Sequence, residues 1–443
     1  MQPRAIALLP MLLFLALFIG SGLYYQSRDV EFAFYQISAP VAILPAIVLA
    51  LALGSGALSK RIETFIAGVG DNTIITMCLI YLLAGAFASV AKAVGGVDAT
   101  VSFGLSVIPE SLVLPGLFVI TAFVATSMGT SMGTIAAIAP VAVGLSEATD
   151  LSLALSVGTV IGGAMFGDNL SIISDTTIAA TRSQGCAMRD KFRLNLVIAL
   201  PAAAITLVLL FILGDSGPIA EPGDYELIRV LPYVAVLVLA VAGLNVMLVL
   251  FTGIVLAGLV GLLSVADYSI AQLSKDIYAG YTGMQEILIL SLLIGGLGAL
   301  MKRQGGLEFL SRAIDRLTRG SSERRSGEAS IAASVALTNL CTANNTVAII
   351  ISGSLARDIA SRHGVDPRRS ASLMDIFSCV IQGILPYGAQ MLLAGSIAAL
   401  SPLELIGSTY YCWLLGVVGI FAIITGIPKL GERPAARLAG SEI

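Results

Sequence analysis

Two aspartates stand within an apolar stretch that is long enough to cross a membrane. Asp168 and Asp175 belong to the segment FGDNLSIISDTT, which interrupts the apolar run at 152–181. A carboxylate at membrane depth is costly unless it is paired, coordinated or protonated, so its presence indicates function. Hard cations prefer oxygen ligands, and the same segment supplies more of them. The neighbouring candidate ligands are Asn169, Ser171, Ser174 and Thr176.

Capping of a helix is the alternative role for the residues at this interruption. Asp168 and Asn169 are residue types that cap the N-terminus of a helix, here the second half of a broken helix. Asp175 faces the same side as Asp168 if that part of the segment is helical, and the two carboxylates are then a candidate sodium site. Soft and nitrogenous ligands are missing from the segment, which disfavours zinc and copper. Sodium is expected as a transported ion, and no cofactor is expected.

A third candidate carboxylate stands in the second half of the chain. Asp375 comes early in the apolar stretch 370–400, soon after Arg368 and Arg369. A shallow salt bridge to one of these arginines and a place in the ion site both suit this position. The segment QGILPYGAQ interrupts the same stretch and adds Gln390 to the candidate ligands.

Two more polar segments interrupt apolar stretches, TSMGTSMGT at 126–134 and TNLCTANNT at 338–346. Their side chains supply neutral hydrogen-bond donors and acceptors. Such groups either satisfy the backbone where two helices meet or complete an ion site. The candidates are Thr130, Ser131, Thr134, Asn339, Thr342, Asn344, Asn345 and Thr346.

The composition shows which solvent surrounds these elements. Of the 443 residues, 57 % are hydrophobic and only 12 % are charged, with a mean hydropathy of +0.93. Soluble domains carry about 25 % charged residues, so lipid must cover much of this chain. A soluble enzyme and a nucleic-acid binder are thereby excluded. The chain also lacks a phosphate-binding glycine loop and a nucleophile–base pair, which disfavours a membrane enzyme and an ATP-driven pump.

The distribution of positive charge predicts the topology. Of the 25 lysines and arginines, 21 lie in six segments, whereas the loop at 215–226 is acidic. The positive-inside rule places these six segments, and with them both termini, in the cytoplasm. The six segments are Arg4, 59–63, 182–193, 302–328, 356–369 and 429–443.

This topology requires two hairpins that do not cross the membrane. The stretch 329–356 lies between two cytoplasmic segments, so it must enter the bilayer and return on the same side. The same reasoning makes 112–146 a hairpin that enters from outside. Non-helical backbone at membrane depth persists only where protein buries it or it lines a cavity. We therefore expect an all-α polytopic membrane protein with about ten transmembrane helices and two re-entrant hairpins.

The two hairpins belong to an internal repeat. When the two halves are aligned at their polar segments, Thr126, Thr130 and Thr134 fall on Thr338, Thr342 and Thr346. The first repeat, 1–215, holds the hairpin 112–146 and the broken helix 152–181; the second, 229–428, holds the hairpin 329–356 and the broken helix 370–400. Because the hairpins enter from opposite sides, the repeats are inverted, which is typical of secondary transporters.

The polar motifs resemble those of the NhaC-type sodium/proton antiporter family in the ion transporter superfamily. That family reads approximately G-T-S-W-G-T and then F-G-D-K-x-S-P-x-S-D-T-T, and residues 129–134 and 166–177 follow both patterns. The second half is similar at Thr342-Ala343, Asp375 and Leu385-Pro386. This sequence departs from the family at Met132, Asn169, Ile172 and Tyr387-Gly388. The resemblance implies an elevator-type movement, a homodimer and a bacterial cytoplasmic membrane location.

The sequence favours a secondary active transporter that exchanges sodium for protons by alternating access. Removal from water raises the pKa of an aspartate from about 3.9 toward neutrality, so protons compete with sodium for such a site. A sodium- or proton-coupled carrier or exchanger of an organic acid or amino acid is the alternative, with the solute carboxylate at the hairpin tips. A passive channel is a third possibility, but two hairpins and an inverted repeat suit alternating access better.

Overall fold

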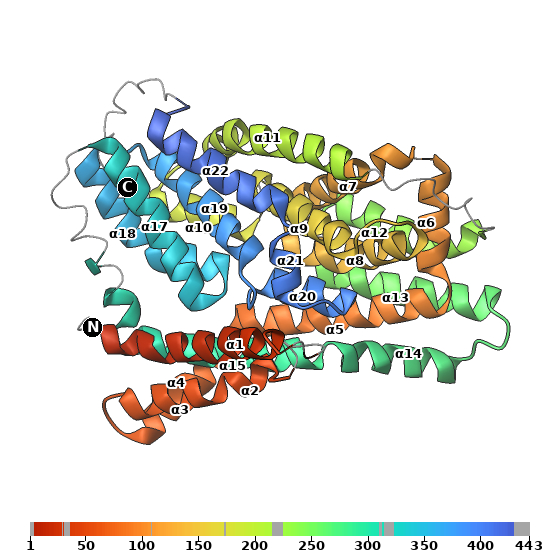
Figure 1. The fold of residues 1–443 in the computed structure, drawn as a ribbon, viewed down its shortest axis with the longest axis horizontal. Helices are drawn as coiled ribbons and strands as arrows, with labels where there is room; N and C mark the ends of the chain where they lie inside the picture. The colour runs from red at the N-terminus through yellow and green to blue at the C-terminus, as the bar shows by residue number, and fades with distance from the viewer. Residues whose placement is uncertain are drawn as a thin grey trace, which may run out of the picture.

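All regular structure in the described residues is helical. The computed structural model describes residues 4–28, 30, 36–107, 109–171, 174–214, 225–309, 312–313 and 323–428 (Figure 1). Eight helices in this part of the chain are long and apolar enough to cross a membrane, and five shorter apolar helices accompany them. The expected all-α multi-pass class is confirmed. One apolar helix, Gly96–Val107, was not anticipated from the sequence, because it is too short for a span.

Eleven of the described α-helices precede residue 215, and ten follow residue 224. In the first half they are α1 (Leu9–Gln26), α2 (Ala39–Ala42), α3 (Leu44–Leu53), α4 (Leu58–Val69), α5 (Asn72–Ala93), α6 (Gly96–Val107), α7 (Val113–Met128), α8 (Ser131–Ala148), α9 (Leu153–Leu170), α10 (Asp175–Gln184) and α11 (Met188–Leu213). In the second half they are α12 (Leu227–Val241), α13 (Val246–Ser264), α14 (Ile270–Gly283), α15 (Gln285–Arg303), α17 (Arg324–Thr342), α18 (Asn345–His363), α19 (Pro367–Ile384), α20 (Ala389–Ala398), α21 (Pro402–Ile406) and α22 (Tyr410–Thr425).

The outer helices present apolar side chains rather than charges. Val208 and Phe211 on α11 are more than half exposed, as are Val417 and Phe421 on α22. Large exposed apolar surfaces are unfavourable in water but suit contact with acyl chains. The described helices therefore have the surface of a membrane protein.

Two helix pairs turn back through very short connections. In the α7–α8 pair, Gly129 adopts a left-handed conformation (φ 68°) and Thr130 then caps α8 in extended conformation. In the α17–α18 pair, Ala343 (φ 52°) and Asn344 do the same. Glycine suits the left-handed position at Gly129, whereas Ala343 adopts it despite its Cβ. These turns lie where the sequence predicts the tips of the two hairpins.

The two turns match in a register that differs from the alignment of the threonines. Gly129 and Ala343 are equivalent by conformation, and so are the caps Thr130 and Asn344. The alignment by threonine identity instead paired Thr130 with Thr342, which ends α17 and lies before the turn. Backbone geometry, not residue identity, determines equivalence at a turn. By conformation, therefore, Thr130 corresponds to Asn344 at the two hairpin turns.

The broken helices follow the same register. In this register the start of α9 at Leu153 falls on the start of α19 at Pro367, and the start of α10 at Asp175 falls on that of α20 at Ala389. α9 packs against α7, α8, α11 and α19, so these interrupted helices form the interior of the bundle (Figure 1). α5 lies at one side of this interior, against α8, α13 and α14.

Candidate functional site

Asp168 is the centre of a buried hydrogen-bond cluster. Its side chain is 4 % exposed, and it lies near the C-terminal end of α9. Ser131 donates to Oδ2 at 3.0 Å, and Thr176 donates to Oδ1 at 3.0 Å. Asn345 Nδ2 lies 3.5 Å from Oδ2, at the outer limit of a hydrogen bond. The carboxylate thus joins α9 and α10 to the tips of both hairpins.

The caps of the adjoining helices explain why these donors are available. Ser174 is the N-cap of α10 and accepts a hydrogen bond from the backbone N–H of Thr177, while Thr130 caps α8. These residues satisfy the first N–H groups of their helices. Ser131 follows the cap Thr130, and Thr176 comes two residues after the cap Ser174. The hydroxyls of Ser131 and Thr176 are therefore available to the Asp168 carboxylate. Because Ser174 caps α10, the alternative that Asp168 and Asn169 cap that half-helix is wrong.

A chain of glutamines extends the cluster into the second half of the protein. Gln390 Nε2 donates to Ser131 Oγ at 3.0 Å, and Gln382 Nε2 donates to Gln390 Oε1 at 2.7 Å. The Gln382 amide also donates to the carbonyl of Ala343 at 3.1 Å, whereas its Oε1 has no partner among the described residues. The donors of this chain are directed toward Asp168. The arrangement stabilises negative charge on the carboxylate and leaves one buried oxygen free.

A cavity of about 240 Å³ lies beside Asp168. It is lined by both hairpin tips, the starts of α10 and α20, and one face of α5. Nine of the sixteen residues expected from the sequence line it: Asp168, Asp175, Thr176, Thr130, Ser131, Asn344, Asn345, Thr346 and Gln390. Asp175, the first residue of α10, is exposed and stands at this cavity rather than in the buried cluster.

The other seven expected residues do not line the cavity. Several of them satisfy the backbone instead: Thr134 donates to the carbonyl of Thr130, Thr342 to that of Thr338, and Asn339 to that of Ser378. The seven residues are Asn169, Ser171, Ser174, Thr134, Asn339, Thr342 and Asp375.

Asp375 belongs to a buried ion pair behind the cavity. Lys191 Nζ lies 2.7 Å from Asp375 Oδ2, and neither side chain is exposed. Asn195 donates to the same Oδ2 at 2.7 Å. The expected alternative partners are wrong, since Arg368 pairs with Asp366 and the buried Arg369 pairs with Glu328.

Lys191 also holds the end of the broken helix. Its ammonium donates to the carbonyl of Asn169 at 2.9 Å and to Thr177 Oγ1 at 2.6 Å, and Asn195 donates to the same carbonyl. These contacts satisfy backbone that the break in the helix leaves free. The sequence reasoning counted Lys191 as a cytoplasmic loop charge and missed this role. The spacing of Lys191 and Asn195, one helical turn apart at the start of an apolar run, was the available signal.

The sequence reasoning also missed Gln382 and the α5 face of the cavity. That face consists of Asn72, Thr73, Thr76, Met77 and Ile80. In the register set by the two turns, Gln382 is the counterpart of Asp168. That register was the signal for Gln382, whereas the α5 face becomes apparent only from the packing of α5 against the bundle.

The donor set is one buried carboxylate surrounded by neutral oxygens and amides. Within the described ranges, no basic side chain forms an ion pair with Asp168, and no group of three His, Cys, Asp or Glu side chains converges. A carboxylate with hydroxyl and amide oxygens can bind a hard monovalent cation or a proton.

The chain is similar to several known transporters. The chain is 24 % identical to the Na⁺/H⁺ antiporter NhaC of Bacillus subtilis, over 86 % of this chain and 90 % of that protein. It is 22 % identical to a malate-2H⁺/Na⁺-lactate antiporter of B. subtilis, over 88 % of each chain. The arginine/ornithine antiporter ArcD of Halobacterium salinarum is 22 % identical over 72 % of each chain. The structural match to the YdaH transporter of Alcanivorax borkumensis spans 95 % of this chain and 99 % of that chain. The sequence identity is 14 % and the TM-score is 0.43.

The family comparison confirms the resemblance inferred from the motifs. The matched residues, 4–214 and 225–427, include both hairpins and both broken helices. The protein is a transporter and not an enzyme. The chain belongs to the Na⁺/H⁺ antiporter family.

Proposed function

We propose that this secondary antiporter exchanges sodium ions for protons at a single site centred on Asp168. The observation that carries the proposal is the contrast between two buried carboxylates. Asp375 is neutralised by Lys191 at 2.7 Å, whereas Asp168 receives only neutral donors and faces a cavity. A buried charge without a countercharge favours binding a cation, and either a proton or sodium neutralises it.

Sodium and the proton exclude one another in this arrangement. Sodium is coordinated by an Asp168 oxygen, the hydroxyls of Ser131 and Thr176 after their rotation, and the free Oε1 of Gln382. A proton on the same carboxylate removes the negative charge that holds sodium. Asp175 at the exposed part of the cavity attracts cations toward the site, because its negative charge raises the local cation concentration.

We further propose that the chain consists of two inverted repeats, 1–215 and 229–428. Helix starts and caps that match in one register support the repeat, and the charge distribution supports the inversion. In this proposal about ten spans and the two re-entrant hairpins α7–α8 and α17–α18 lie in a bacterial cytoplasmic membrane with both termini inside. The unit of hairpins and broken helices moves as an elevator against α5 and α15, within a homodimer.

Exchange of an organic acid or amino acid is the second candidate function. Two relatives are named as antiporters of malate with lactate and of arginine with ornithine. The cavity of about 240 Å³ exceeds the volume of a bare cation, and the amides of Asn344, Asn345 and Gln390 border it. These amides suit a carboxylate or amino group of a small solute.

Proton flux in proteoliposomes tests the first candidate against the second. Sodium added without organic solute should drive proton movement, and the apparent sodium affinity should fall about tenfold per pH unit once the site is mostly protonated. Because linkage is reciprocal, sodium should weaken apparent proton affinity by the same factor. Proteoliposomes that stay silent until malate, lactate or an amino acid is added would overturn the proposal and support the second candidate.

A further inference from the structure

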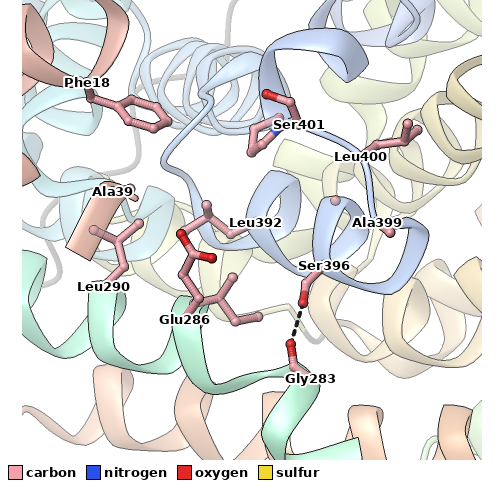
Figure 2. Close-up of a pocket in the computed structure, with 13 residues that line it drawn as sticks. Phe18, Ala39, Gly283, Glu286, Leu290, Leu392, Ser396, Ala399, Leu400 and Ser401 are labelled. Atoms are coloured by element: carbon pink, nitrogen blue, oxygen red, sulfur yellow. Dashed lines mark hydrogen bonds between the residues drawn. The ribbon is translucent and has the colours of Figure 1, made fainter. Parts of the chain in front are cut away.

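α20 lines a second cavity in addition to the cavity at Asp168. It has a volume of about 440 Å³ and is formed by α15, α20 and α21 with parts of α1 and α2 (Figure 2). Of the described residues that line it, all but one are uncharged, and most of them are apolar. The charged residue is Glu286, in the first turn of α15, and Figure 2 shows it among the residues that line this cavity.

The α15 face of this cavity repeats the α5 face of the Asp168 cavity. Both faces show the same helical spacing of lining residues. The hairpin register matches three lining positions of α15 with α5, and a shift of four residues, one helical turn, matches all four. In this shifted alignment Thr73, Thr76, Met77 and Ile80 on α5 correspond to Gly283, Glu286, Ile287 and Leu290 at the α14–α15 junction and on α15.

Direct contacts support this alignment independently of the cavities. The two helices touch at Cys78 Sγ and the Leu288 carbonyl, 4.0 Å apart, and at Tyr81 OH and Ser291 Oγ, 3.2 Å apart. Both contacts join positions that the alignment of the two faces makes equivalent. A contact between equivalent positions of two repeats arises where a two-fold axis relates them, so α5 and α15 are placed symmetrically about their crossing.

We propose that Glu286 is a cation-binding carboxylate of the transport path, which faces the Asp168 site in the opposite-facing state. The proposal rests on the proposed function, since it requires alternating access by inverted repeats. In the present state the site faces Thr73 and Thr76 on α5. After the movement, the symmetric face of α15 takes their place, and Glu286 occupies the position that Thr76 holds now.

Contacts of the hairpin tips define the two states. Asn344 at the α17–α18 tip donates to Met77 Sδ on α5 at 3.3 Å. The equivalent pair, Thr130 at the α7–α8 tip and Ile287 on α15, comes together in the opposite state. At present α20 covers that face, since Ser396 Oγ donates to the Gly283 carbonyl at 2.9 Å (Figure 2).

The α5 and α15 faces differ in chemistry, so Glu286 should affect cation binding from one side of the membrane only. The α5 face offers two threonine hydroxyls to a passing cation, whereas the equivalent α15 positions offer no side-chain oxygen except that of Glu286. The Glu286 carboxylate accepts a hydrogen bond from the backbone N–H of Ala39, and most of the other described residues around it are apolar. Its negative charge therefore attracts a monovalent cation. Removal of this charge should weaken cation affinity on that side of the membrane alone.

Two measurements test the proposal. The background carries Cys186→Ser and Cys341→Ser and keeps the three buried cysteines. Thr76→Cys and Glu286→Cys, introduced one at a time, should react with a membrane-impermeant maleimide from opposite sides of the membrane. Glu286→Gln should weaken apparent sodium affinity about tenfold from the side that labels position 286 and less than twofold from the other side. Glu286→Asp keeps the charge and should retain most of the affinity. Labelling of both cysteines from one side, or equal loss of affinity on both sides, would overturn the proposal.

The tip contacts provide a test that does not depend on the transported solute. A short bifunctional thiol reagent should link Met77→Cys to Asn344→Cys, and in a separate variant Thr130→Cys to Ile287→Cys. The second link should abolish labelling of Thr76→Cys, since it holds the opposite state. If the protein shows no sodium–proton exchange but the cross-linking and labelling results are as expected, Glu286 lies on the transport path of another solute. A Thr130–Ile287 link that leaves Thr76→Cys reactive would refute the assignment of Glu286.

Discussion

Lys191 on α11 and Asp375 on α19 form an ion pair at 2.7 Å with both side chains fully buried. The pair neutralises the carboxylate that the sequence places nearest to arginines. Asp168, which lines the cavity, forms no ion pair with any of the described basic side chains. Lys191 also binds the carbonyl of Asn169, directly after Asp168. The pair therefore supports the break in α9–α10 without occupying the proposed ion site.

Removal of one partner of this pair should destabilise the protein strongly. Lys191→Met leaves the Asp375 carboxylate buried without its countercharge, which costs about 3–5 kcal/mol. The double variant Lys191→Met/Asp375→Leu should recover much of this loss. Thermal unfolding in detergent, followed by size-exclusion chromatography, measures both effects. If the single and double variants lose equal stability, the pair has no special energetic role.

Asp168→Asn should abolish exchange while the protein still folds and inserts. The amide keeps the size of the side chain but cannot hold sodium by charge or exchange a proton at neutral pH. Asp175→Asn is the matched control: it lines the same cavity but is exposed, so it should keep exchange with a weaker apparent sodium affinity. Proton flux in proteoliposomes measures both variants. Near-normal exchange by Asp168→Asn would remove that residue from the site.

Ser131→Ala should weaken apparent sodium affinity more than Thr176→Val. Both side chains donate to Asp168 at 3.0 Å, but Ser131 also accepts from Gln390 and connects the two halves. A hydrogen bond to a charged group contributes about 1.5–3 kcal/mol, so a loss of roughly tenfold or more is expected for Ser131→Ala. Thr134→Val is the control, since its hydroxyl binds the Thr130 carbonyl and Met128 Sδ rather than the carboxylate. A similar loss in Thr134→Val would indicate a general packing effect.

Labelling across the membrane tests the hairpin α17–α18. Cysteines at Arg325, near the start of α17, and at Arg362, near the end of α18, should both react with an impermeant reagent only from the cytoplasm. A cysteine at Asp150, in the exposed connection between α8 and α9, should react only from outside. Reaction of positions 325 and 362 from different sides would make this segment a full span and remove the inverted repeat.

Alkylation of Cys186 should require unusually high pH. Burial, with smaller contributions from Asp190 and Asp366, raises the pKa of the Cys186 thiol to about 11. The thiolate is the reactive form, so the rate should rise about tenfold per pH unit up to that value. Iodoacetamide kinetics in a Cys341→Ser background measures this rate, and Asp366→Asn should shift the curve to lower pH. A plateau near the ordinary thiol pKa of about 8.5 would contradict the expectation.

The sequence by itself determined the membrane class and predicted Asp168 as the principal site residue. Apolar runs and sparse charge are local properties, so they identify lipid as the solvent whatever the packing. Asp168 was identified for the same reason, because a carboxylate within an apolar run is costly in any fold. The turns at Gly129 and Ala343 also follow from short polar segments between apolar stretches.

Only the tertiary structure decided which polar groups meet. The sequence associated Asp375 with the nearby Arg368 and Arg369, yet its partner is Lys191 on another helix. Gln382 and the α5 face line the cavity because helices that are distant in the sequence pack there. The periodicity of one helix does not show which other helix it contacts. The register of the repeat likewise depended on backbone conformation at the turns and not on the matching threonines. Local patterns specify which residues need a partner in the membrane, and packing specifies which partner each receives.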